Sequence, residues 1–151
     1  DITALPLAVT LLTFPVLAVT LGGWFQAAFP QQGRSVTVDE ANFHLKSFQL
    51  PTAAKDVNFR RAKADPCPEQ ADFAISQAEF LAWTGAMGWQ AHVFQRGPDW
   101  PMPEMGGERD LPADMKFGFF FRECHTPDCR DRTFGYYDND RQRASVRACR
   151  E

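Results

Sequence analysis

The beginning of the chain lacks charge: residues 2–25 contain no Asp, Glu, Lys or Arg. A helix of that length is about 36 Å long, which is enough to cross a hydrocarbon core of about 30 Å. No basic residue precedes the run, and the run is longer than the apolar part of an ordinary signal peptide. Pro6, Pro15 and the missing polar face argue against a buried helix in a soluble core. We therefore predict a transmembrane anchor over residues 1–26, in contact with the lipid bilayer.

The chain also lacks the common catalytic motifs. It has no Gly-x-Ser-x-Gly, no phosphate loop and no His-Glu-x-x-His, and its three histidines (His44, His92 and His125) have no evident partners. Its 16 basic and 19 acidic side chains give a net charge of −3, so no basic footprint for nucleic acid is present. We therefore expect no enzyme activity, no cofactor, no metal site and no nucleic-acid partner.

One face of the predicted anchor carries threonines at the spacing of a heptad stripe, and a pair of small residues adds a small-xxx-small spacing. A threonine stripe gains nothing from lipid, whereas a neighbouring helix can pack against it. Alternatively, each hydroxyl bonds to a carbonyl of its own helix. We predict that this face contacts other membrane protein subunits through Thr3, Thr10, Thr13, Thr20, Ala18 and Gly22.

All four cysteines follow the apolar run: Cys67, Cys124, Cys129 and Cys149. An even number in a small domain is typical of an oxidising compartment, and it predicts two disulfides in a periplasmic or otherwise extracytoplasmic domain. We favour Cys124–Cys129 together with Cys67–Cys149, while pairing of Cys149 with Cys124 or Cys129 stays open. A zinc site at Cys124, His125 and Cys129 is the alternative, but the spacing is not Cys-x-x-Cys and no second close pair exists.

Residues 27–34 are predicted to be a linker, and residues 35–151 an extracytoplasmic α+β domain made of an antiparallel sheet and one main helix. The segment Ser76-Gln77-Ala78-Glu79 is a capping box that predicts the helix start, and the helix should stop near Gly85 or Gly88. Asp138-Asn139-Asp140 predicts the turn of a late hairpin. Extended segments are expected at 43–50, 57–59, 89–94, 115–122, 133–137 and 144–149.

A long connection over residues 95–114 holds four prolines and three glycines. Loops of this length inside a compact domain are usually functional or face a partner. We therefore take Trp100, Met102 and Met105 as candidate partner contacts, and the alternative is that they fold back on the sheet.

Three stretches carry a resemblance: LPTAAKDVNF (50–59), ADFAISQAEFLAWTGAMGW (71–89) and FGYYDNDRQRASV (134–146). They resemble a loose family of small exported bacterial domains, often anchored to a membrane or a lipid. The resemblance covers roughly residues 50–149 and implies an exported α+β module with no catalytic activity. Ser145 and Val146 stand where the family's last strand usually has an aromatic residue.

These features together predict a non-catalytic accessory subunit of a larger membrane complex, for which a photosynthetic or respiratory assembly is one example. The predicted anchor would pack against the complex, and the extracytoplasmic domain would contact partner subunits. The alternative is a membrane-tethered binding or sensing domain that acts alone through residues 95–114.

Overall fold

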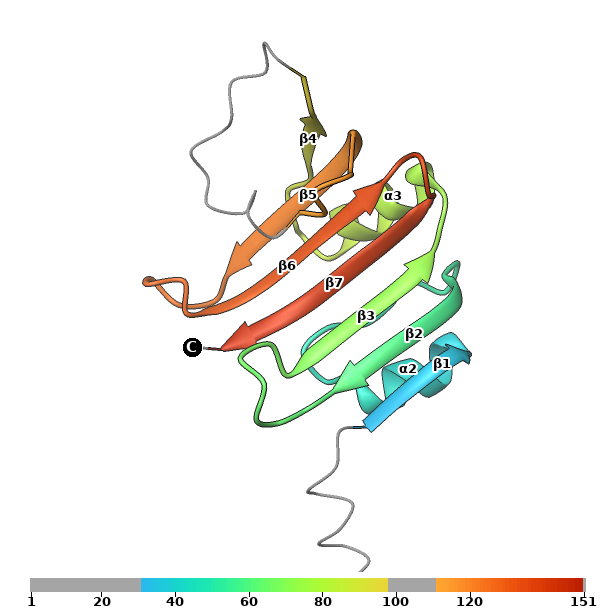
Figure 1. Cartoon of the computed structure of the whole chain (residues 1–151). Coiled ribbons are helices and arrows are strands. Elements are labelled where there is room, and N and C mark those ends of the chain that lie inside the picture. The colour runs from blue at the N-terminus through green and yellow to red at the C-terminus, as the bar shows by residue number, and fades with distance from the viewer. Residues whose placement is uncertain (1–30, 98–110, 151) are drawn as a thin grey trace, which may run out of the picture. The chain divides into compact units, whose positions relative to one another are not determined.

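The computed structural model describes residues 31–97 and 111–150. Its strands form one antiparallel sheet in the order β1-β2-β3-β7-β6-β5-β4 (Figure 1). The predicted α+β domain with an antiparallel sheet and disulfides is therefore confirmed. Along the chain the elements are β1 (Gln31–Val36), α2 (Val38–His44), β2 (Lys55–Arg61), β3 (Glu69–Ala74), α3 (Gln77–Ala86), β4 (His92–Gln95), β5 (Phe117–Cys124), β6 (Asp131–Asp138) and β7 (Arg143–Arg150).

Several predicted features lie outside the described residues. These are the transmembrane anchor, residues 27–30 of the linker, and the candidate contacts Trp100, Met102 and Met105. The sheet begins at Gln31, which is earlier than the domain boundary expected at residue 35. Within 31–97 and 111–150, no helix has both the length and the apolar character needed to cross a bilayer.

Helix α2 corrects the extended segment predicted at 43–50, because residues 38–44 are helical and residues 45–50 contain no strand. Within the described residues, the short helix α2 thus accompanies the main helix α3. The Thr37 hydroxyl accepts a hydrogen bond from the Glu40 amide at 3.2 Å, which caps the helix start. Asp39 and Glu40 lie in the first turn, where negative charge is favourable. His44 therefore ends a helix and stacks on the Phe59 ring at 5.1 Å, instead of lying on a sheet surface.

Helix α3 begins where the capping box predicts. The Glu79 amide donates to the Ser76 hydroxyl oxygen at 3.3 Å, and the Ser76 amide donates to the Glu79 carboxylate at 3.2 Å. The helix ends at Ala86, and Gly88 follows with a φ of +74°. A positive φ at this position is the usual way to leave a helix, and glycine adopts it without strain.

Both helices lie on the same side of the sheet (Figure 1). Phe80 and Trp83 of α3 pack with Phe73, Phe121 and Tyr137 of the strands in the main hydrophobic core. The Phe80 and Tyr137 rings stack at 5.2 Å between centroids. Because successive strand residues point to opposite faces, Phe120 and Phe134 lie on the other side of the sheet. There they form a smaller cluster with Phe94, Leu111 and Met115.

The Ser76→Ala substitution should destabilise the domain by about 1 kcal/mol, because it removes an N-cap. The Ser76 hydroxyl holds the pKa of Glu79 below its usual value, so the substitution should also raise that pKa. Since the folded pKa is lowered, the stabilisation from this contact is present above the ordinary pKa of Glu and is lost as pH falls through the lowered one. Urea unfolding of the full chain in mild detergent, with an NMR titration of Glu79, measures both effects.

The matched control is Gln77→Ala, at the exposed first position of the same helix. It should change the unfolding free energy by less than about 0.5 kcal/mol. Equal effects of the two substitutions would contradict the capping role.

Candidate functional site

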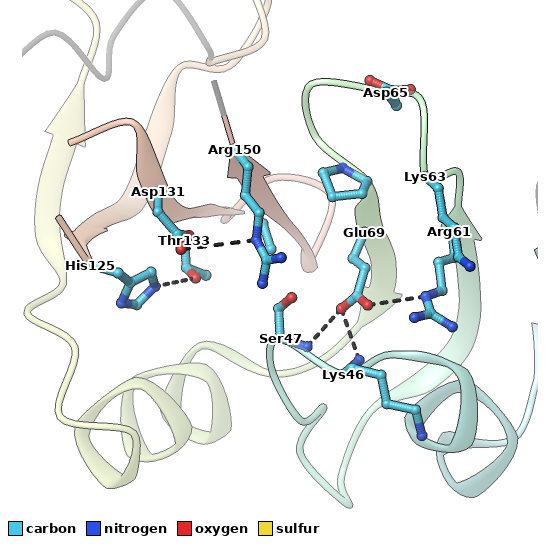
Figure 2. Close-up of a pocket in the computed structure, with 12 residues that line it drawn as sticks. Lys46, Ser47, Arg61, Lys63, Asp65, Glu69, His125, Asp131, Thr133 and Arg150 are labelled. Atoms are coloured by element: carbon cyan, nitrogen blue, oxygen red, sulfur yellow. Dashed lines mark hydrogen bonds and ion pairs between the residues drawn. The ribbon is translucent and has the colours of Figure 1, made fainter. Parts of the chain in front are cut away.

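A pocket of about 700 Å³ opens at one end of the sheet, on the side that carries the helices (Figure 2). This volume lies within the usual range for small-molecule sites. The walls come from the loop after α2, the β2–β3 connection, the β5–β6 hairpin and the last residues of β7. The lining residues are Lys46, Ser47, Arg61, Lys63, Asp65, Pro68, Glu69, His125, Asp131, Thr133, Ala148 and Arg150.

The pocket floor is one row of the sheet. Arg61 pairs with Glu69, Glu69 with Ala148, and Ala148 with Thr133 across four neighbouring strands. Residues paired in this way share a face of the sheet, so the four side chains meet although they are far apart in the sequence. The antiparallel register alone therefore assembles the floor.

Glu69 is the polar centre of this floor, and it is only 4 % exposed to solvent. Its carboxylate accepts hydrogen bonds from the Lys46 and Ser47 amides, at 2.8 and 2.7 Å. The Arg61 Nε lies 3.2 Å from its other oxygen. A buried charge is tolerated when it is paired and hydrogen-bonded in this way. Glu69 therefore fixes the loop after α2 to the sheet and so shapes the pocket.

The opposite wall is the hairpin between β5 and β6. The His125 amide donates to the Asp131 carbonyl at 2.7 Å, and the His125 Nε2 lies 2.9 Å from the Thr133 hydroxyl. Thr133 is buried, so its hydroxyl requires such a partner. The imidazole is thereby held in place at the side of the pocket.

The remaining charged side chains form the rim. The Arg150 Nε lies 3.9 Å from the Asp131 carboxylate, and the Arg150 side chain is 70 % exposed. The Lys46 Nζ donates to the Phe43 carbonyl at 2.7 Å. Asp65 pairs with Arg60 at 3.0 Å, outside the pocket. Within the described residues, Lys63 forms no ion pair.

Both disulfides border the pocket. Cys67 is bonded to Cys149, and these residues flank the wall residue Pro68 and the floor residue Ala148. Cys124 is bonded to Cys129 in the hairpin that carries His125. This is the favoured one of the three predicted pairings. Since all four cysteines are bonded in pairs, none is left as a thiolate for the alternative zinc site.

Sequence reasoning did not identify this pocket. It named the four cysteines, and it considered His125 as a zinc ligand beside Cys124 and Cys129. In the structure Asp128 pairs with Arg130 at 3.2 Å, and the Thr126 hydroxyl and the Arg130 amide lower its pKa. His92 lies in β4, away from the pocket. Across residues 31–97 and 111–150, no three His, Cys, Asp or Glu side chains are grouped to hold a metal ion.

Comparisons with known proteins add no relative. No protein-family model, no curated protein and no solved structure matches the chain.

The two disulfides should differ in their contribution to stability. In the chain-entropy relation, a bridge that closes 82 residues contributes about 4.5 kcal/mol, and one that closes 5 residues about 2 kcal/mol. The double variant Cys67→Ser/Cys149→Ser should therefore lose about 2.5 kcal/mol more than Cys124→Ser/Cys129→Ser. Urea unfolding of both full-length variants tests the difference, and an equal or reversed order would contradict it.

Replacing Glu69 should loosen the pocket. Glu69→Ala leaves two amides and the Arg61 guanidinium without their acceptor, and such a loss costs about 3–5 kcal/mol. Glu69→Gln keeps one acceptor oxygen and should cost less. Hydrogen exchange of the Lys46 and Ser47 amides should accelerate in Glu69→Ala, since these amides donate to the carboxylate. Unchanged exchange there would show that Glu69 does not hold the loop.

Proposed function

We propose that this protein is a non-catalytic binding domain of an oxidising, extracytoplasmic compartment, which takes a small ligand in the pocket over β3, β6 and β7. The observation that supports this proposal is the pocket. It is large enough for a small molecule, and its walls are held by an ion pair, two amide hydrogen bonds and two disulfides. A pocket whose walls are already fixed loses little conformational entropy when a ligand binds.

The distribution of hydrogen bonds favours binding over catalysis. Glu69, which would be the first candidate for a general base, accepts hydrogen bonds from two amides and forms an ion pair with Arg61. The His125 imidazole forms a hydrogen bond with the hydroxyl of Thr133, a residue that is only 1 % exposed. A general base needs a free position within hydrogen-bond reach of its substrate. Both groups serve the architecture of the pocket instead.

Blocking the pocket should abolish ligand binding. Ser47 is exposed, and its side chain points into the pocket (Figure 2). Its backbone amide donates to the Glu69 carboxylate. Ser47→Trp should therefore fill the pocket while this backbone amide still donates to the carboxylate. Thermal-shift screening of the full chain in mild detergent against a library of small metabolites should find ligands that raise Tm in the parent and not in Ser47→Trp.

Thr52→Trp is the matched control, because Thr52 is exposed and does not line the pocket. It should keep every shift seen in the parent. Ligands that stabilise Ser47→Trp as well as the parent would place binding elsewhere, and a screen in which Ser47→Trp removes no shift would overturn the proposal.

An accessory subunit of a membrane complex is the second candidate function. The observation that favours it is the charge-free run over residues 2–25, with its threonine-bearing face. A subunit of this kind emerges from mild detergent extraction with partner chains in fixed proportion. A tethered domain that acts alone emerges without them, so the composition of the extract separates the two.

A further inference from the structure

We infer that the ligand of this pocket is a small organic anion, recognised through a carboxylate or phosphate group between Lys63 and Arg150. This inference rests on the proposed binding function and names the ligand class. It follows from three observations: the charge balance of the lining residues, the placement of Lys63 and Arg150, and the contacts already made by the buried Glu69 carboxylate.

The lining residues are locally positive in a chain whose net charge is −3. Among them, Glu69 is neutralised by Arg61, and Asp65 by Arg60. Lys63 and Arg150 then remain beside the carboxylate of Asp131, because the Lys46 Nζ donates to the Phe43 carbonyl. An excess of positive charge in a concave site attracts ligands of negative charge. The pocket therefore selects for an anion.

The cations stand on different walls. Arg150 ends β7, and Lys63 follows β2, two strands away across β3. Neighbouring strands lie about 4.8 Å apart, so the two backbones are separated by about 10 Å. Both side chains are long enough to reach an oxyanion placed between them. The Ser47 hydroxyl also points into this space and supplies a neutral donor (Figure 2).

Arg150 is available for such a ligand. Its contact with Asp131 spans 3.9 Å at an exposed position, where an ion pair contributes little. A guanidinium can instead bind a carboxylate or phosphate through two parallel hydrogen bonds, which is the stronger arrangement. A cationic ligand would find only the Asp131 carboxylate among the lining residues, because Glu69 accepts two amide hydrogen bonds and pairs with Arg61, and Asp65 pairs with Arg60.

The test compares a neutral sugar with its phosphate ester and with a tricarboxylate. Isothermal titration of the full chain in mild detergent uses glucose 6-phosphate, citrate and glucose. Glucose 6-phosphate or citrate should bind with a Kd of about 1 mM or lower, and glucose at least about tenfold more weakly. The two anions distinguish a phosphate from a carboxylate preference.

Three variants, one of them a control, test which charged side chains bind the anion. Lys63→Gln/Arg150→Gln should weaken anion binding at least about tenfold, since it removes two charge-assisted contacts. The control Arg34→Gln/Lys55→Gln changes the net charge equally at exposed positions outside the pocket, and it should change affinity less than about twofold. Asp131→Asn removes the opposing carboxylate and should strengthen binding about two- to threefold, a gain that a merely structural role would not give.

The outcomes separate the two proposals. Glucose binding as tightly as glucose 6-phosphate, with both blocked in Ser47→Trp, would overturn the anion inference and leave the binding function standing. The inference also fails if neither anion binds, or if the control weakens binding as much as Lys63→Gln/Arg150→Gln does. Anion binding that persists in Ser47→Trp would show that the anion binds outside this pocket, and it would overturn the proposed binding function of the pocket.

Discussion

The pairing of β3 with β7 is the interaction on which the rest of the domain depends. It joins β1–β2–β3 to β4–β7 through a register that runs from Glu69 opposite Ala148 to Ala74 opposite Arg143. At one end, Arg143 donates to Asp72 at 3.0 Å and to Asp56 at 2.7 Å, and so reaches across to β2. At the other end, Cys67 is bonded to Cys149. Without this pairing, the floor of the pocket would not exist.

The Arg143 contacts also influence the acid stability of the sheet. Arg143 holds the pKa of Asp56 below its usual value, mainly through its side-chain hydrogen bond. A lowered folded pKa means that this contact stabilises the sheet above the ordinary pKa of Asp, and that the stabilisation disappears as pH falls through the lowered value. The β2–β3–β7 end opposite the pocket is therefore tied together at neutral pH.

Local signals in the sequence predicted the parts of the fold that local chemistry determines. The Ser76–Glu79 capping box located α3, the aromatic segments located β5 and β6, and the Asp138 turn located the last hairpin. Helix α2 had a comparable signal, Thr37 followed by Glu40. The apolar residues from Phe43 onward instead led to the prediction of an extended segment.

Strand β3 and the pocket could not be found in the same way. The strand contains Gln70 and Asp72 and has low β propensity, and only the alternation of Ala71, Phe73 and Ile75 marks its buried face. Since the pocket floor depends on the register of this strand, missing β3 meant missing the site. Glu69, Lys63 and Arg150 look like ordinary surface charges until the register brings them together.

The buried polar side chains of this site hold the pocket in its shape. Glu69 and Thr133 are both buried in the floor and both fully engaged with neighbouring groups. Lys63 and Arg150 at the rim are the groups that the proposed ligand would contact. This division suits a receptor whose walls stay fixed while only the side chains at its mouth respond.

The separation of β3 from β7 along the chain also has a kinetic consequence. Their facing residues Glu69 and Ala148 are far apart in the sequence, and α3 and the strands β4, β5 and β6 are made between them. Closing so long a loop precedes any gain from the pairing, and folds dominated by such non-local contacts form slowly. Until β7 emerges from the ribosome, β3 has no inner neighbour and the sheet cannot close. The complete sheet therefore forms only after β7 has been synthesised.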